Sequence, residues 1–136
     1  MKIYILVSAI FLVMLFPRVS ADTKMVYTAG ELPHRQEVWV HALEWCESSA
    51  MEKINPNDKD NTPSYYFWQF KPDTFKEKAE KYGVIEKGQG KDKIMVLLKD
   101  YELQHKTINA MVRDGKNQNW GQLFPDCVKR LGTPPL

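Results

Sequence analysis

One glutamate in the chain stands where a general acid could work. Glu47 directly follows Trp45 and Cys46, at the end of a segment with helical spacing. A carboxyl group beside apolar side chains is partly desolvated, and desolvation raises its pKa because it disfavours the carboxylate. A carboxyl group of this kind can donate a proton near neutral pH. The sequence therefore makes Glu47 the candidate catalytic residue, against the alternative that it only ends a helix in water.

A short aromatic segment over residues 64–70 offers groups that suit a carbohydrate. The rings of Tyr65 and Tyr66 could stack on sugar rings. The side chains of Ser64 and Gln69 could form hydrogen bonds with hydroxyl or acetamide groups. These four residues are the candidate substrate-binding residues, and the alternative is that the aromatic side chains belong to the core.

The elements that must position these residues are predicted to be mostly helical. A first helix over 35–46 should end near 47–49. Turn-forming residues fill 55–63, and 64–70 has the propensity of a short strand or of a tight approach to a helix. The spacing i, i+4, i+7 and i+8 predicts that the first helix buries one face, made by Val38, Ala42, Trp45 and Cys46.

The rest of the chain is also predicted to be helical. A second helix should begin at 72–74 and end at Gly83. Apolar residues over 94–112 predict a single long helix of roughly 20 residues, which Gly115 closes. A short capping helix is expected within 120–131. We therefore expect a mostly α domain with one short irregular or β insert directly after the first helix.

The N-terminus has the pattern of an export signal. Lys2 precedes an almost continuous apolar stretch over 3–16, and small residues end at Ala21. This pattern predicts a signal peptide over 1–21, a flexible leader over 22–34, and a folded domain over 35–136 in a secreted or periplasmic protein. The alternative is a retained anchor, and the membrane would then be contacted only through this uncleaved segment.

Export changes the interpretation of the two cysteines. In an oxidising compartment, an even number of cysteines indicates a disulfide, here between Cys46 and Cys127. The alternative is two independent buried cysteines. Neither cysteine has a Cys or His at ligand spacing, and the three histidines (His34, His41 and His105) are scattered. We therefore expect no metal site and no cofactor.

The charge balance argues against nucleic acid as a partner. Residues 22–136 keep 17 of the 19 Lys and Arg residues, because Lys2 and Arg18 lie before them, and all 17 Asp and Glu residues. The net charge of this part is therefore zero, which lacks the basic surface that binds phosphate backbones. We expect a monomer that does not bind nucleic acid.

Several of these features together resemble the lytic transglycosylases and goose-type lysozymes. They are Glu47-Ser48 at the end of a Trp-bearing helix, the Asn/Asp-rich stretch 55–63, and the pattern Ser-Tyr-x-x-x-Gln-Phe-Lys-Pro-x-Thr-Phe over 64–75. The resemblance covers roughly 38–131. It implies a lysozyme-like α+β fold and cleavage of the β-1,4 bond between N-acetylmuramic acid and N-acetylglucosamine in peptidoglycan. The catalytic Glu of that family falls on Glu47, and its Ser and Gln near the cleft fall on Ser64 and Gln69.

The resemblance implies a mechanism with one carboxyl group. Glu47 would protonate the glycosidic oxygen and then, as a carboxylate, deprotonate the muramoyl 6-hydroxyl, which closes a 1,6-anhydro ring. A lysozyme-type hydrolase is the alternative, and it would need a second acid. Asp58 and Asp60 are the candidates for that second acid, although both are equally explained as turn residues.

The chain departs from the family pattern at Tyr66, where the family usually has Gly. Glycine tolerates a positive φ and a close approach of the backbone to a ligand, and tyrosine does so only at a cost. Either the insert takes a different path, with Tyr66 in a sugar subsite, or the cleft is altered or blocked. A blocked cleft would make the protein an inactive module that binds glycan or protein, and a helical domain without any cleft is a further alternative.

Overall fold

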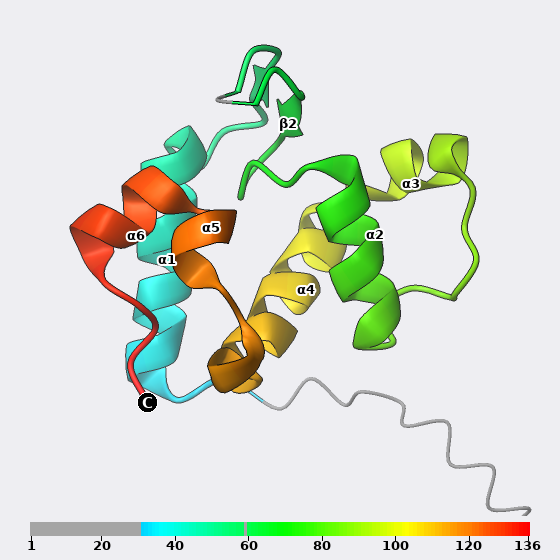
Figure 1. Ribbon diagram of the computed structural model, residues 1–136. Helices are drawn as coiled ribbons and strands as arrows, with labels where there is room; N and C mark the ends of the chain where they lie inside the picture. Colours follow the sequence, from blue (N-terminus) through cyan, green and yellow to red (C-terminus); the bar gives the residue numbers. More distant parts are fainter. Residues whose placement is uncertain (1–30, 59) are drawn as a thin grey trace, which may run out of the picture.

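Six α-helices and one two-stranded antiparallel hairpin make up the part of the chain that the computed structural model describes, residues 31–58 and 60–136 (Figure 1). The predicted signal peptide and most of the predicted leader lie outside these residues. The hairpin directly follows the first helix, so the predicted mostly α fold with a short β insert is confirmed.

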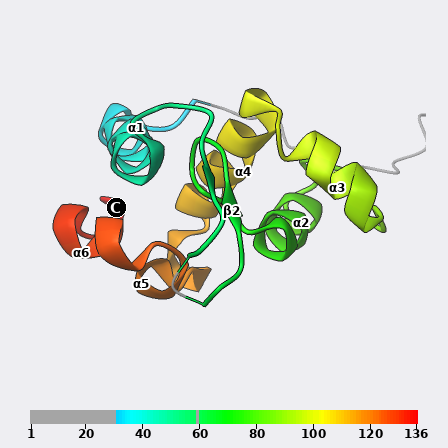
Figure 2. The same cartoon turned by 90° about the horizontal axis from the view of Figure 1, so that it is seen from above.

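The bounds of the elements follow the chain in order. They are α1 (His34–Ser48), β1 (Ile54–Asn55), β2 (Ser64–Tyr65), α2 (Pro72–Lys81), α3 (Lys91–Leu97), α4 (Tyr101–Arg113), the 3-10 helix η1 (Gly115–Asn117), α5 (Trp120–Leu123) and α6 (Pro125–Leu131). α1 contacts α4 and α6, and α2 contacts α3 and α4. Seen from above, the hairpin region lies between α2 on one side and α1 with α5 and α6 on the other (Figure 2).

The core is centred on the turn that follows β2. Trp68 and Phe70 are fully buried there, among side chains from α1, α2, α3, α4 and the C-terminal helices. The indole N–H of Trp68 donates to the carbonyl of Val40 in α1 at 3.1 Å, and its backbone N–H donates to Oε1 of Gln104 in α4 at 3.2 Å. This turn therefore joins two helices that are far apart in the sequence.

The buried face of α1 is not the predicted one. Val38 and Trp45 are 54% and 67% exposed, whereas Val40 and Leu43 are fully buried. The helix carries a second stripe at i, i+3, i+4, i+7 and i+8, and this stripe is the one turned inward. Hydrophobic periodicity did not reveal this stripe in the sequence, because several of its members are polar. The stripe consists of Val40, Leu43, Glu44, Glu47 and Ser48.

The predicted single long helix is wrong, because the segment is divided into α3 and α4. Asp100 caps the N-terminus of α4, since its side chain accepts a hydrogen bond from the N–H of Leu103 at 3.1 Å. The side-chain amide of buried Gln104 donates to the carbonyl of Leu98 at 2.6 Å, which provides a partner for a backbone carbonyl at the end of α3. The apolar period continues across the break, so periodicity alone missed it.

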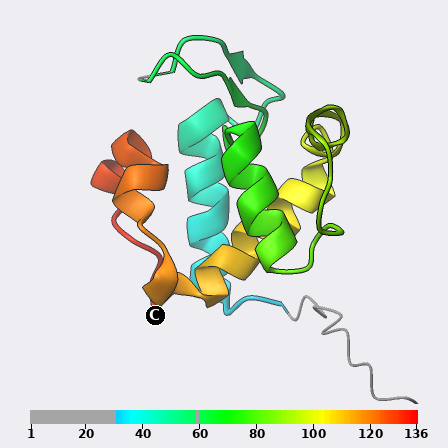
Figure 3. The same cartoon turned by 45° about the vertical axis from the view of Figure 1, so that its right-hand side comes forward.

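The helix after the hairpin follows its sequence signals. α2 begins at Pro72 and ends at Lys81, with Phe75 and Ala79 buried and Gly83 at a φ of 67° after it. At the C-terminus, the predicted capping helix is two short helices, α5 and α6. The chain then returns along α1 (Figure 3), where the indole N–H of Trp39 donates to the carbonyl of Gly132 at 3.1 Å.

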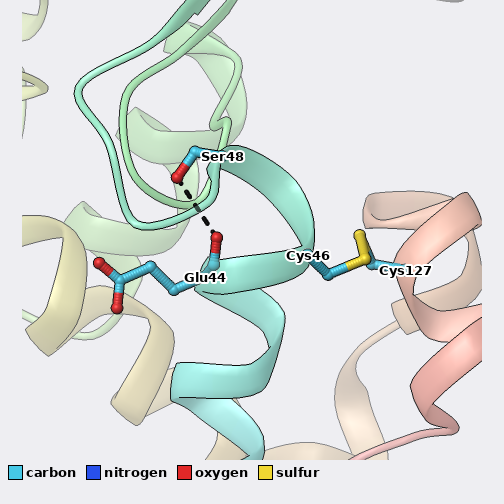
Figure 4. Close-up of a disulfide and its surroundings, with 4 residues drawn as sticks. All are labelled: Glu44, Cys46, Ser48 and Cys127. Atoms are coloured by element: carbon cyan, nitrogen blue, oxygen red, sulfur yellow. Dashed lines mark hydrogen bonds between the residues drawn. A yellow bond between two sulfur atoms is a disulfide. The ribbon is translucent and has the colours of Figure 1, made fainter.

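The predicted disulfide between Cys46 and Cys127 is present and joins α1 to α6, with the Cα atoms 5.8 Å apart (Figure 4). It encloses 81 positions of sequence. A disulfide of this kind is consistent with an oxidising, extracytoplasmic compartment. Among the described residues, no helix combines the length and the apolar character needed to cross a membrane.

Removal of the disulfide should destabilise the protein strongly. The chain-entropy relation gives a loss of about 4.5 kcal/mol in the free energy of unfolding for a loop of this length. We expect a loss of this order for the double variant Cys46→Ala/Cys127→Ala in urea denaturation, compared with the oxidised wild type. Each single variant should be at least as unstable as the double variant, because it also leaves a reactive thiol. A loss below 1 kcal/mol would contradict the importance of this cross-link.

Candidate active site

A cleft of about 660 Å³ lies at the C-terminal end of α1. Its lining comes from the end of α1, from the hairpin and its loop, from the turn before α2 and the first part of that helix, and from the region that contains α5 and α6. Its lining is dominated by polar side chains, and Glu47, Ser64 and Gln69 all belong to it. Three of the five residues that the sequence analysis proposed for the site are therefore brought together.

Glu47 has the properties of a general acid. Its side chain is largely buried in the wall of the cleft, and burial raises its pKa to about 7. The negative charges of Asp58 and then of Asp126 add to this effect, because they also disfavour the carboxylate. The predicted rise of the Glu47 pKa through desolvation is confirmed, but Trp45 does not provide the burial, because its side chain is largely exposed.

Ser64 and Gln69 hold the wall of the cleft through hydrogen bonds. The hydroxyl of Ser64 donates to Oε1 of Gln69 at 3.1 Å. The amide nitrogen of Gln69 donates to the backbone carbonyls of Tyr66 at 2.6 Å and Lys53 at 2.8 Å. The side-chain amide of Gln69 is therefore fully engaged within the insert. These contacts make both residues positioning residues for the hairpin, and Ser64 is only 1% exposed.

Tyr65 and Tyr66 do not line the cleft. Tyr66 is 4% exposed in the core, and Tyr65 packs against the core from the hairpin. Tyr66 has a φ of 62°, the conformation that glycine adopts easily, and its N–H donates to the carbonyl of Lys53 at 2.5 Å. The insert thus follows the path that a glycine would allow, and the tyrosine ring is directed into the core. Neither a sugar subsite at Tyr66 nor a cleft blocked by its ring agrees with this geometry.

The two aspartates of the loop differ in their surroundings. Asp60 forms an ion pair with Lys71 and accepts hydrogen bonds from Thr62, and these contacts lower the pKa of Asp60. Asp58 instead acts on Glu47 through its charge. The geometry therefore separates two residues that the sequence left equivalent, and Asp58 is the carboxylate coupled to the candidate acid.

The sequence analysis missed the side of the cleft contributed by the C-terminal region. Amide side chains of Asn117, Asn119 and Gln122 line it there, together with the carboxyl group of Asp126. Asn119 donates from Nδ2 to Oε1 of Gln122 at 3.0 Å. The clustering of amides over 117–122 was visible in the sequence, but only the folding of α5 and α6 onto α1 brings them into the same cleft as the hairpin.

The buried carboxyl group of Glu47 predicts a pH-dependent stability. The protonated form is favoured in the folded state, so wild-type stability should fall as the pH rises from about 4.5 through 7. Glu47→Gln removes this ionisation. At pH 8 the variant should be more stable than the wild type by about 2 kcal/mol, given about 1.4 kcal/mol per pKa unit and partial solvent screening. At pH 4.5 the difference should be small.

Urea denaturation at both pH values measures this difference. The matched control is Glu86→Gln, which makes the same charge change at an exposed side chain. The control should not reproduce the pH-dependent gain. A difference between Glu47→Gln and the wild type that stays constant between pH 4.5 and pH 8 would contradict the raised pKa.

The chain matches no protein-family model, no curated protein and no solved structure in comparisons with each of these. The resemblance to lytic transglycosylases therefore rests on the quoted residues of this chain.

Proposed function

We propose that the protein is a lytic transglycosylase that cleaves the β-1,4 bond between N-acetylmuramic acid and N-acetylglucosamine in peptidoglycan, with Glu47 as its only acid and base. The observation that carries this proposal is a glutamate with a pKa of about 7 in the wall of a cleft of about 660 Å³. A cleft of this size is within the range of small-ligand sites, and perturbed carboxyl groups in clefts are typical of catalytic acids.

The pKa of Glu47 suits both halves of this reaction. Protonated Glu47 donates its proton to the glycosidic oxygen, and the bond from that oxygen to the muramoyl C1 breaks through an oxocarbenium-like state. The resulting carboxylate accepts the proton of the muramoyl 6-hydroxyl, whose oxygen forms the new bond to C1. This closes the 1,6-anhydro ring and regenerates the acid, so no water is consumed. A group with a pKa near the working pH is present in both forms.

The polar lining fits an uncharged, acetylated sugar. Amide side chains offer both donors and acceptors to hydroxyl and acetamide groups, and three of them come from two distant parts of the chain: Asn55 from the hairpin, and Asn119 and Gln122 from the C-terminal region. Peptidoglycan lies outside the cytoplasm, which agrees with the disulfide and with the predicted signal peptide. We therefore propose a secreted or periplasmic location.

A lysozyme-type hydrolase is the second candidate, and Asp58 favours it. The charge of Asp58 raises the pKa of Glu47, so the two carboxyl groups interact in the same cleft. A second carboxylate could activate a water molecule or stabilise the positive charge at C1. In that case the same acid step would be followed by hydrolysis in place of ring closure.

Digestion of purified peptidoglycan distinguishes these functions. We expect the wild type to release muropeptides with 1,6-anhydro ends, identified by mass spectrometry. Glu47→Gln should lower the rate by about 10²- to 10⁴-fold, because it keeps the shape of the side chain and removes the transferable proton. The exposed control Glu86→Gln should retain the wild-type rate.

Each other outcome has a defined meaning. Reducing ends, together with a strong loss of activity in Asp58→Asn, would favour the hydrolase over the transglycosylase. Glycan binding by the wild type without any cleavage would contradict both and leave an inactive binding module. A Glu47→Gln variant as active as the wild type would remove Glu47 from the reaction.

A further inference from the structure

Two of the three histidines lie close together where α1 meets α4. His41 in α1 and His105 in α4 stack with their ring centroids 5.7 Å apart and an angle of 27° between the rings. Glu37 lies one helical turn before His41, and one possible ligand atom of each of the three residues lies within 4.8 Å of the others. The sequence analysis considered the histidines scattered, because the contact between α1 and α4 is not visible in their spacing.

We propose that Glu37, His41 and His105 bind a zinc ion that links α1 to α4. Two imidazole nitrogens and a carboxylate oxygen form a donor set that Zn²⁺ prefers, with a fourth position left for water. At bond lengths of about 2.0–2.2 Å, tetrahedral ligand atoms are roughly 3.4 Å apart. The three side chains therefore have to draw together by up to about 1.4 Å. The side chain of His41 is half exposed, so this ring is able to adjust.

Glu44 orients the first of these rings. Oε2 of Glu44 lies 3.3 Å from Nδ1 of His41, and it also accepts a hydrogen bond from the hydroxyl of Tyr101 at 3.4 Å. The Glu44 residue is 5% exposed, so a buried carboxylate accepts the proton on Nδ1 of His41 and leaves Nε2 to bind the metal. A carboxylate that holds the second nitrogen of a histidine in this way is characteristic of zinc sites. Glu44 is thus a positioning residue for the proposed metal.

Asn109 can serve His105 in the same way. Its Nδ2 lies 3.4 Å from Nε2 of His105, while its Oδ1 is buried and has no hydrogen-bond partner among the described residues. If the amide is rotated by 180°, Oδ1 faces Nε2 of His105 and accepts its hydrogen bond. This arrangement fixes the proton on Nε2 and leaves Nδ1 of His105 to bind the metal.

The proposed zinc would hold α1 from the side opposite to the disulfide. Glu44 and Cys46 extend to opposite sides of the helix in Figure 4. The disulfide joins α1 to α6, and the metal would join it to α4. The helix that carries Glu47 would then be cross-linked on both sides, which would stabilise the wall of the cleft.

Titration of Zn²⁺ tests this site in the untagged protein after treatment with a chelator. We expect isothermal titration calorimetry to show binding of one equivalent and thermal unfolding to shift to a higher temperature with added Zn²⁺. His41→Ala, at a half-exposed side chain, should lower the affinity at least about tenfold and remove the thermal shift. The matched control is His34→Ala, an exposed histidine near the start of the same helix, which should bind Zn²⁺ like the wild type.

Two more variants separate the roles of the carboxyl groups. Glu44→Gln should weaken Zn²⁺ about tenfold or more, because it removes the charge that orients His41. Glu47→Gln should bind Zn²⁺ like the wild type, so failure of the zinc proposal and failure of the proposed enzymatic function are distinguishable. No binding to the wild type, or equal affinity in the wild type and His41→Ala, would overturn the proposal.

Discussion

The structure depends on the burial of one tryptophan from the loop region. Trp68 is inserted between α1 and α4, with its indole donating to Val40 and its backbone to Gln104. Burial of about 200 Å² of such a side chain contributes about 5 kcal/mol. This outweighs the cost of the positive φ angles of Tyr66 and Gln69, about 1–2 kcal/mol each. The turn is strained because its centre has to enter the core.

The same turn makes the wall of the cleft. Ser64 lies in β2, the strand that leads into the turn, and Gln69 lies at the end of the turn, and their hydrogen bonds fasten the turn to the hairpin at the carbonyl of Lys53. The core and the cleft therefore share this segment of backbone, because the turn that buries Trp68 also carries polar side chains into the lining of the cleft. A change that loosens the tryptophan would be expected to disturb the cleft as well.

The α1 helix has a different task on each side. One stripe carries Val40 and Leu43 into the core and, one turn further, presents Glu47 to the cleft, so the desolvation of Glu47 follows from the packing of the whole helix. The side that bears Cys46 is tied covalently to α6. The charges of Asp58 and Asp126 reach Glu47 from the hairpin loop and from α6, so the acidity of one carboxyl group depends on three elements.

Features that depend on neighbouring residues or on side-chain chemistry could be predicted from the sequence. Pro72 and Gly83 marked α2, the cysteine count indicated the disulfide, and Glu47 stood out as a carboxyl group near apolar residues. The buried stripe of α1 and the direction of the tyrosine rings followed instead from the packing of the helices and the hairpin. This packing also brought His41 to His105 and the amides of 117–122 to the cleft. The reason is that turns and caps are set by local hydrogen bonds, whereas burial depends on contacts between elements that are distant in the sequence. In α1 these contacts bury the polar residue Glu44 and leave the apolar residue Trp45 exposed, which is the reverse of what hydrophobic periodicity predicts.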